Sequence, residues 1–283
     1  MPELPEVEVL VRHLRPLLRN QTVRGVNVRR AKTIAPATPR DFARALRGAE
    51  FMDVSRRGKY LVFALRRQNS ATALRLVGHL GMTGRMYLAP VKAALPKHAA
   101  VVFDLGQHQF IFEDTRYFGR LTLDSAGLEK LGPEPLETEA APGNFAQALQ
   151  RSAQAVKIKL LDQSLVAGVG NIYASEALFR AGISPLRPAR RLTEQQVKTL
   201  WDAVREVLDE AIRFGSTVPL SYSGAGRKDR LFYFGRAAEA PDFYAERLRV
   251  YDRQGQACPD CGTAIRRVVQ AGRSTFYCPQ CQR

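Results

Sequence analysis

The chain has 283 residues, a formal net charge of +16 and 45% hydrophobic residues. This hydrophobic content excludes a disordered tail, and we expect no membrane span because no run of 18 or more apolar residues is present. The charge favours a polyanionic partner, either nucleic acid or an anionic membrane, although a merely soluble basic surface stays open. The first ten residues carry three glutamates and no basic segment, so they are not a secretory signal, and the cytoplasm is the expected compartment.

The first half of the chain shows two hydrophobic periods in succession. Residues 6 to 18 repeat apolar side chains at helical spacing on one face. From about residue 22 to 124, short segments rich in β-branched and aromatic residues alternate with glycine and charged turns. This pattern predicts one helix followed by antiparallel strands in a sandwich or barrel, and it excludes alternating βαβ units.

The second half changes to helical patterns. Residues 132–144 are rich in Pro, Gly and Glu, which is typical of an interdomain linker. Thr193 and Gln196 form a capping box at the start of a long amphipathic helix, and Gly215 is expected to close that helix at its C′ position. Residues 221–229 show no periodicity and are expected to form a mobile loop.

The four cysteines all lie in the last 26 residues, as two CxxC pairs that are 16 residues apart. They are Cys258, Cys261, Cys278 and Cys281. The spacing matches four-thiolate zinc sites, with a hairpin bringing the two turns together, and two disulfides or free thiols are the alternatives. Four thiolates leave no open coordination position, so the expected Zn²⁺ is structural and not catalytic.

The N-terminus carries a candidate nucleophile. Removal of Met1 would leave Pro2 with a free secondary amine, and α-amino groups titrate near about 8, far below lysine. Attack of this amine on a sugar C1′ would form a Schiff base, with Glu3 and Glu6 beside it as proton donors or base. The alternative is that these residues only start a helix, whose dipole the two acids complement.

A glycine-rich turn in the second half is a candidate phosphate site. Gly168 and Gly170 allow close backbone approach, and Asn171 is expected to cap the helix that follows, so that its first amide groups face outward. A tight turn without a ligand is the alternative. The segment lacks the lysine and hydroxyl signature of a nucleotide-binding P-loop.

Several longer motifs occur in one order along the chain. They are MPELPEVE (1–8), RRGKYL (56–61), HLGMTGR (79–85), DTRYFGR (114–120), LLDQSLVAGVGNIYASEALFRAGISP (160–185) and the cysteine tail. Together they resemble the formamidopyrimidine-DNA glycosylase family, also called MutM-like or Fpg/Nei, over essentially the whole chain. The resemblance implies an α+β fold: an N-terminal antiparallel β-sandwich with an N-terminal helix (1–131), a linker (132–144), a helix-two-turn-helix domain (145–251) and a zinc finger (252–283).

The resemblance also implies catalytic roles. Pro2 resembles the family's nucleophile and Glu3 its general acid at the sugar. Lys59 lies where the family has a strand lysine that contacts DNA and transfers protons in β-elimination, although an ordinary exposed strand cation is the alternative. Arg273, between the cysteine pairs, resembles the zinc-finger arginine that touches phosphates and supports δ-elimination.

Further residues resemble the family's DNA contacts. Excision from a duplex requires extrusion of the nucleotide, and the resulting space is filled by apolar wedges and a cation. Met82, Arg116 and Phe118 match that trio, although Met82 and Phe118 could instead be core residues. The remaining contacts implied by the resemblance are His98, Arg151 and Asn171.

The expected enzyme is therefore a bifunctional DNA glycosylase and abasic-site lyase that removes oxidised purines such as 8-oxoguanine and formamidopyrimidines from duplex DNA. It is expected to act as a monomer with one structural Zn²⁺, in the cytoplasm, or on the nucleoid if the source is bacterial. Ala100, where a second histidine is common, Ala153, where a lysine is common, and the loop at 221–236 depart from the family's pattern, so the lesion preference is open. The alternatives are a Nei-like enzyme for oxidised pyrimidines, which PELPE disfavours, and a non-catalytic zinc-containing lesion-binding protein.

Overall fold

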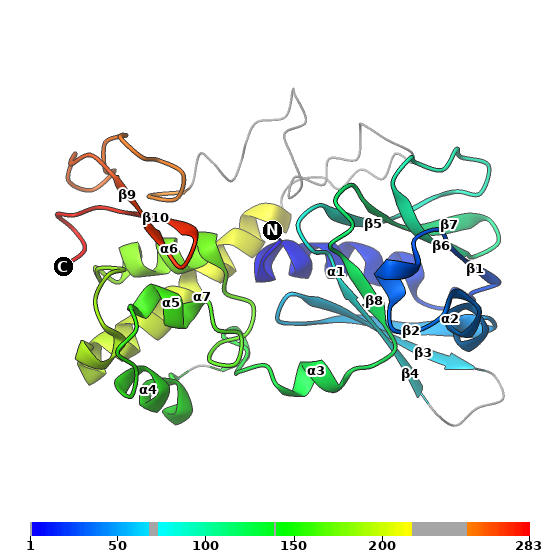
Figure 1. The fold of residues 1–283 in the computed structure, drawn as a ribbon, viewed down its shortest axis with the longest axis horizontal. Coiled ribbons are helices and arrows are strands. Elements are labelled where there is room, and N and C mark those ends of the chain that lie inside the picture. Colours follow the sequence, from blue (N-terminus) through cyan, green and yellow to red (C-terminus); the bar gives the residue numbers. More distant parts are fainter. Residues whose placement is uncertain (1, 68–72, 139, 217–247) are drawn as a thin grey trace. The chain divides into compact units, whose positions relative to one another are not determined.

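The computed structural model describes residues 2–67, 73–138, 140–216 and 248–283. The backbone divides into two compact units, shown in Figure 1: a β unit (Met1–Glu129 and Gly215–Pro241) and a helical unit (Lys130–Phe214 and Asp242–Arg283). The loop at 221–236, whose role the sequence left open, lies outside the described residues. No helix in the described ranges combines the length and apolarity that crossing a bilayer requires.

The β unit is an antiparallel sandwich with helices at its start. It contains α1 (Leu4–Leu18), β1 (Gly25–Val28), η1 (Ala31–Ile34), α2 (Pro39–Leu46), β2 (Ala49–Arg57), β3 (Tyr60–Arg67), β4 (Ala73–His79), β5 (Gly84–Pro90), β6 (Ala99–Asp104), β7 (His108–Asp114), β8 (Arg120–Thr122) and α3 (Ala126–Glu129). Two four-stranded sheets have the orders β1-β6-β7-β5 and β2-β3-β4-β8. All of their neighbouring strands pair antiparallel, which confirms the predicted N-terminal helix and antiparallel β fold.

One hydrophobic core joins α1 to both sheets. Phe51 and Phe63 from one sheet meet Phe110 from the other in edge-on ring contacts of 5.6 to 6.1 Å between centroids. All three side chains are fully buried, and each such burial contributes roughly 1.5–3 kcal/mol to folding. At the surface, Arg15 of α1 donates to the Val54 carbonyl of β2 at 2.7 Å, which fixes the helix along that strand.

The helical unit contains α4 (Gly143–Gln150), α5 (Val156–Leu160), α6 (Asn171–Arg180), η2 (Ala189–Arg191), α7 (Glu194–Ser216) and a hairpin of β9 (Arg266–Gln270) and β10 (Arg273–Tyr277). The capping box of α7 is confirmed, because Thr193 N–H donates to Gln196 Oε1 and Gln196 N–H to Thr193 Oγ1. The prediction that Gly215 closes this helix is wrong, since α7 continues to Ser216. Packing of its buried stripe outweighs the cost of about 1 kcal/mol for a helical glycine.

The segment at 132–144, expected as an interdomain linker, packs on the helical unit. Trp201 Nε1 donates to the Thr138 carbonyl at 3.3 Å, and Arg205 Nε donates to the Pro135 carbonyl at 3.1 Å. Helix α4 begins within the segment, at Gly143. Its Pro- and Gly-rich composition therefore reflects irregular backbone and not a free tether. The predicted domain limits of 1–131, 145–251 and 252–283 stay predictions.

Candidate functional site

The N-terminus of the β unit holds Pro2 and Glu3 in a buried position. Pro2 is buried, Glu3 is 2% exposed, and α1 begins directly after them. Glu3 N–H donates to Glu6 Oε2 at 2.7 Å, while the Glu3 side chain accepts from the Glu6 backbone in a reciprocal capping box. Glu6 therefore fixes the backbone next to Pro2, and the conformation of the candidate nucleophile is set by α1 itself.

Lys59 lies in the tight turn between β2 and β3, so the expected position within a strand is wrong. The residue is 6% exposed, so the alternative of an exposed strand cation is wrong as well. Arg56 connects this turn to α1, because its Nε donates to Glu8 Oε2 at 3.0 Å and its Nη1 to the Gly58 carbonyl at 3.1 Å. Glu8 also accepts from Arg12 at 2.8 Å. Helix α1, which begins just after Pro2 and Glu3, and the turn that carries Lys59 are thus joined by a partly buried ion pair.

Hydrogen bonds keep Glu8 charged at this junction. Burial alone would raise the pKa of the Glu8 carboxyl, but the hydrogen bonds from Arg12 and Arg56 lower it overall. Sequence reasoning singled out neither Glu8 nor Arg56 as functional. The signal was present, because both residues belong to motifs that also contain Pro2 or Lys59, MPELPEVE and RRGKYL.

His79, at the end of β4, is a second residue that sequence reasoning missed. It lies cross-strand from Tyr60, with 4.9 Å between the ring centroids, and its Nδ1 accepts from Gly81 N–H at 3.2 Å. Burial, followed by the charges of Lys59 and Arg120, lowers the pKa of His79 to about 4. The imidazole is therefore neutral at pH 7, and with Nδ1 as acceptor its proton resides on Nε2.

Met82, Arg116 and Phe118 are surface residues of the β unit. Met82 is 42% exposed and Phe118 is 50% exposed, so the alternative that they are core residues is wrong. The Arg116 guanidinium lies 5.1 Å from the centre of the Phe118 ring. A single exposed apolar side chain is ordinary, but these two lie in neighbouring loops, and a cation lies against the Phe118 ring.

His98 takes part in a three-residue stack. Its Nδ1 lies 3.0 Å from the Tyr117 hydroxyl, and the Arg30 guanidinium lies 4.6 Å from the centre of the Tyr117 ring. Tyr117 stands between Arg116 and Phe118 with a positive φ of 54°. Tyr117 lies in the motif DTRYFGR, but sequence reasoning did not single it out, and Arg30 lies outside the quoted motifs. Ala100, in place of a second histidine, is fully buried in the core.

Asn171 does not cap α6, contrary to expectation. Gly170 is the N-cap residue, and Asn171 is the first residue of the helix. The Asn171 side chain is bound instead to two distant groups, because its Oδ1 accepts from Lys157 Nζ at 2.7 Å and its Nδ2 donates to the Ser274 carbonyl at 2.9 Å. Gly168 lies in a bend with a φ of +85°, a conformation that only glycine adopts readily.

Lys157 of α5 is the centre of this network. The side chain is fully buried, and its ammonium donates to Asn171 Oδ1, to the Ser274 carbonyl at 3.0 Å and to Thr275 Oγ1 at 2.7 Å. It thereby joins α5, the start of α6 and β10, whose first residue is the exposed Arg273. Arg151, at the C-cap of α4, is also exposed.

Replacing Lys157 with Met is expected to lower the stability of the helical unit. Met has similar bulk, but Thr275 Oγ1 and Asn171 Oδ1 lose the ammonium that donates to them, while the Ser274 carbonyl still accepts from Asn171 Nδ2. An unsatisfied buried polar group such as Thr275 Oγ1 costs about 1–3 kcal/mol. Thermal unfolding should show a clear decrease in Tm. Lys159→Met is the matched control, because its ammonium lies nearer the surface and pairs with Asp162 alone among the described residues. Equal Tm values for the two variants would contradict this role for Lys157.

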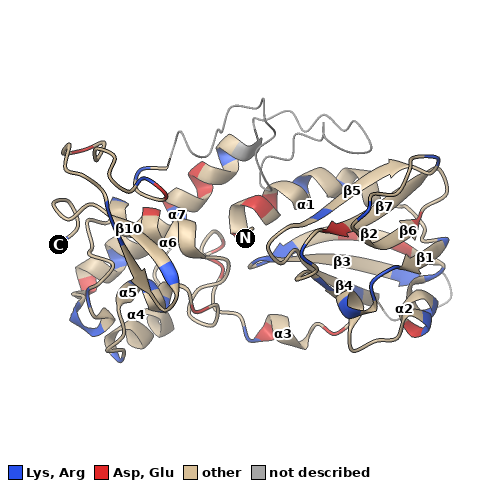
Figure 2. Ribbon diagram, turned by 45° about the horizontal axis from the view of Figure 1, so that its top comes forward, with Lys and Arg blue, Asp and Glu red and all other residues tan. Residues whose placement is uncertain are grey.

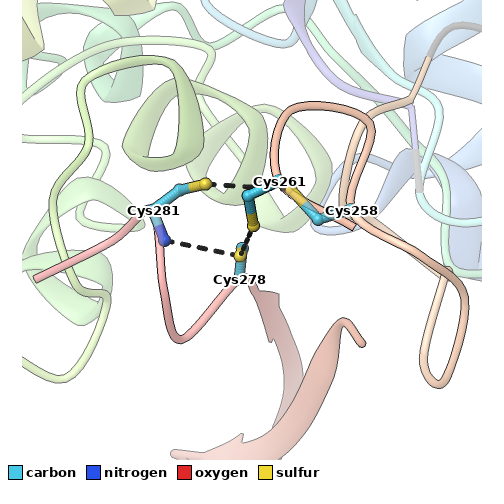
Figure 3. A group of neighbouring side chains, drawn as sticks. All are labelled: Cys258, Cys261, Cys278 and Cys281. Atoms are coloured by element: carbon cyan, nitrogen blue, oxygen red, sulfur yellow. Dashed lines mark hydrogen bonds between the residues drawn. The ribbon is translucent and has the colours of Figure 1, made fainter. Parts of the chain in front are cut away.

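The four cysteines of the helical unit form one cluster. Figure 3 shows the turn with Cys258 and Cys261 facing the turn with Cys278 and Cys281. The Sγ atoms of all four lie within 4.8 Å of one another, with 3.9 Å for Cys258 to Cys281 and 3.5 Å for Cys261 to Cys278. Tetrahedral Zn–S bonds of about 2.3 Å require sulfur separations of roughly 3.8 Å. The donor set and its geometry therefore fit zinc, and the alternative of two disulfides is wrong, since all four thiols are free.

Three family models match this chain. The formamidopyrimidine-DNA glycosylase N-terminal domain matches residues 1–121, the formamidopyrimidine-DNA glycosylase H2TH domain matches 131–221, and the zinc finger found in FPG and IleRS matches 255–283. Curated relatives agree. The formamidopyrimidine-DNA glycosylase of Thermus thermophilus is 44% identical, covering 100% of this chain and 98% of the relative. That of Desulfitobacterium hafniense is 39% identical, covering 100% of both.

Solved structures give the same result. Lactococcus lactis Fpg in complex with DNA containing an abasic site is 32% identical, with a TM-score of 0.84 over 99% of both chains. A complex of the same protein with DNA containing FAPY-dG has a TM-score of 0.83 at 31% identity over 99% of both chains. The sequence models, the full-length relatives and the fold therefore agree, and the chain belongs to the formamidopyrimidine-DNA glycosylase family.

Proposed function

We propose that this protein is a bifunctional DNA glycosylase and abasic-site lyase that excises oxidised purines, 8-oxoguanine and formamidopyrimidines, from duplex DNA. The observation that carries the proposal is the buried Pro2–Glu3 terminus, which α1 and the Arg56–Glu8 ion pair join to the turn bearing Lys59. The relative from L. lactis, crystallised with DNA containing an abasic site or FAPY-dG, supports the choice of damaged DNA.

The chemistry begins at the Pro2 nitrogen once Met1 has been removed. The lone pair of this nitrogen attacks C1′ of the extruded nucleotide and the glycosidic bond breaks. The base leaves with the electron pair of the broken bond and takes up a proton. Glu3 protonates the sugar ring oxygen, so the ring opens to an iminium. Two eliminations follow: loss of a C2′ proton expels the 3′ phosphate, and loss of the C4′ proton then expels the 5′ phosphate. Water hydrolyses the remaining iminium, which frees the Pro2 amine, releases the sugar remnant as an unsaturated aldehyde and leaves a one-nucleoside gap. Lys59 transfers protons in the first elimination, and Arg273 supports the second.

The protein environment of Pro2 suits a nucleophilic amine. Burial of Pro2 disfavours a charged ammonium at this position, so it increases the unprotonated fraction of the amine. The neutral imidazole of His79 supplies an N–H donor near Lys59 without adding a second positive charge. These features favour attack on C1′ at neutral pH.

DNA contacts are proposed on both units, each considered by itself. On the β unit, Met82, Arg116 and Phe118 fill the space that the extruded base leaves, and His98 contacts a phosphate. On the helical unit, Asn171, Arg151 and Arg273 bind phosphates. Lysines and arginines lie along the elements of both units, as Figure 2 shows, and they supply the electrostatic attraction to the backbone of the duplex.

A single structural Zn²⁺ is proposed for the cysteine cluster. Cys258, Cys261, Cys278 and Cys281 would hold it, and the ion would fix the two turns that flank the β9–β10 hairpin. Its role is to hold that hairpin, and with it Arg273, against α6. The expected monomeric state and the cytoplasmic or nucleoid location stay predictions.

Borohydride trapping tests the proposed activity. The full-length protein is incubated with a duplex that contains 8-oxoguanine opposite cytosine, and separately with a thymine glycol duplex, in the presence of borohydride. The proposal requires a covalent adduct that forms preferentially with the 8-oxoguanine duplex. It also requires strand scission of that duplex in a parallel reaction without borohydride, because reduction of the Schiff base stops the eliminations. Preference for thymine glycol would assign the protein to oxidised pyrimidines, and binding of both duplexes without any adduct would identify a non-catalytic lesion-binding protein.

Binding to duplex DNA is expected to weaken steeply with salt. Each phosphate contact contributes about −0.9 to the slope of log K against log salt concentration. Arg151→Gln should make this slope about one unit shallower without changing lesion preference. Arg44→Gln is the control, because Arg44 already pairs with Asp41 at 2.5 Å on α2. A fluorescence anisotropy titration that gives the same slope for both variants would remove Arg151 from the DNA contacts.

A further inference from the structure

A buried carboxylate joins the two loops that carry the exposed Met82 and Phe118. Asp114, the last residue of β7, is 1% exposed. Its Oδ1 accepts the Thr83 hydroxyl at 2.6 Å and the Arg116 backbone N–H at 3.1 Å, and its Oδ2 accepts the Gly119 backbone N–H at 2.7 Å. Thr83 Oγ1 also accepts the Arg116 N–H, at 3.2 Å. The Asp114 carboxylate therefore binds Arg116 and Gly119, at the two ends of the loop that carries Phe118. It also binds Thr83, the residue after Met82 in the other loop.

The two loops are also packed against each other without space for movement. Gly81 has a φ of +64°, and a Cβ added there would lie 2.6 Å from the Gly119 backbone nitrogen. A Cβ added to Gly119 would lie 2.4 Å from the Phe112 ring and 3.2 Å from Asp114 Oδ2. Glycine at both positions therefore allows the loops to meet at backbone distance, with the carboxylate between them.

The hydrogen bonds of Asp114 and the close contact between the two loops hold the loops more firmly than surface packing requires. The Met82 and Phe118 side chains are themselves exposed, so packing of these two side chains in the core does not account for their position. A side chain that enters a base stack must overcome the stacking energy of the duplex. If its loop first had to become ordered, the entropy lost in that ordering would reduce the binding energy further. A buried carboxylate with three donors holds the loops in one conformation before any contact is made.

We propose that Asp114 is a positioning residue that holds Met82, Arg116 and Phe118 together as one pre-formed wedge for the opening in a DNA duplex. The proposal rests on the proposed function, because it presumes that these three side chains fill the space of an extruded base. Asp114 acts at the step in which the base leaves the stack, and not on the chemistry at Pro2. Its loss should therefore slow the reaction of duplex DNA and leave the reaction of single-stranded abasic DNA unchanged, since that substrate has no stack to enter.

Asp114→Asn is the primary variant, measured in single-turnover excision of 8-oxoguanine from a duplex and in borohydride trapping on a single-stranded abasic oligonucleotide. The amide keeps the size of the carboxylate, but it presents an NH₂ group to one of the donors. Excision from the duplex should fall by about tenfold or more, while trapping on the single strand stays within about twofold of wild type. Thr83→Val, which removes only the hydroxyl link, should give a smaller loss with the same selectivity for duplex.

Asp104→Asn is the matched control. Asp104 Oδ1 accepts the Gly106 N–H at 2.8 Å in the β6–β7 turn, so it makes the same kind of carboxylate-to-backbone bond in another turn of the same sheet. This variant should match wild type on both substrates. Equal losses for Asp114→Asn on duplex and single strand would overturn the proposal, because they would indicate a general structural role. If Asp114→Asn does not fold, Thr83→Val decides by the same criterion.

A double variant, Met82→Ala with Phe118→Ala, separates this proposal from the proposed function. If the double variant excises from duplex as fast as wild type, the wedge itself is wrong and the proposed function of these residues fails. If the double variant is slow and Asp114→Asn is as fast as wild type, only the positioning role is overturned. Where both are slow, adding Asp114→Asn to the double variant should produce no further loss, because the residues that it positions are already absent.

Discussion

Replacing Pro2 with Gly is expected to reduce Schiff-base formation by at least about a hundredfold while DNA affinity changes little. The substitution leaves a primary amine on a flexible residue in place of a nitrogen that the pyrrolidine ring holds in a buried position. Borohydride trapping and single-turnover strand scission measure the first effect, and anisotropy with an uncleavable abasic analogue measures the second.

Arg19→Gln serves as the control for this experiment. Arg19 is exposed at the C-cap of α1, so the variant alters the same helix at the end remote from Pro2. It should retain wild-type trapping. Unchanged lyase rates in the Pro2→Gly protein would remove Pro2 from the mechanism and direct attention to Lys59, the buried amine in the turn joined to α1.

The second large effect is expected for Cys278→Ser. Cys278 is fully buried, and loss of one thiolate should release the proposed zinc, whose binding to such sites is worth about 10–16 kcal/mol at neutral pH. The β9–β10 hairpin would then lose its fixed position, and it carries Arg273 and the acceptors for Lys157 at Ser274 and Thr275. DNA affinity should fall by about tenfold or more, and Tm should decrease.

Elemental analysis of the purified full-length protein reads out the zinc directly, with one equivalent expected for wild type and less than one for Cys278→Ser. Gln280→Ala is the matched control, because Gln280 is exposed in the same turn and supplies no thiolate. A Cys278→Ser protein with a full equivalent of zinc would contradict the four-thiolate site, and full zinc loss with normal DNA affinity would contradict the role of the ion in placing the hairpin.

Local patterns in the sequence predicted the elements that depend on near neighbours. The helical spacing of residues 6 to 18 and the capping box at Thr193 and Gln196 depend on contacts a few residues apart, and the structure contains both. The cysteine spacing was equally informative, since each CxxC pair folds on its own turn. Gly215 shows the limit of this reasoning. A glycine at this position predicts the end of the helix, but burial along α7 outweighed that preference and the helix continues to Ser216.

Partners far apart in the sequence could not be predicted in this way. Glu176 of α6 is an example: its carboxylate accepts backbone N–H groups from Arg249, Val250 and Tyr251, more than 70 residues away. Burial raises the pKa of Glu176, partly offset by those hydrogen bonds. In the sequence it appears as an ordinary helical glutamate. Lys157 and Asp114 were missed for the same reason, since only the folded chain brings their partners together.

The candidate catalytic residues were identified by resemblance to the family more than by physical reasoning from the residues themselves. From the residues alone, the start of a helix was the favoured interpretation of Pro2 and Glu3, and the structure shows that Glu3 is the N-cap of one. Burial of both residues, and the ion pair that joins their helix to the turn of Lys59, distinguish this terminus from an ordinary one. Neither feature is visible in the sequence.

Mass mapping of the borohydride-trapped adduct tests the central claim most directly. Protein trapped on abasic DNA is digested with nuclease and protease, and the peptide that carries the residual sugar is sequenced by fragmentation. The account predicts a peptide that begins at Pro2, lacks Met1 and bears the sugar on its N-terminal nitrogen. A sugar attached to Lys59, or full-rate strand scission by protein that still begins with Met1, would contradict it.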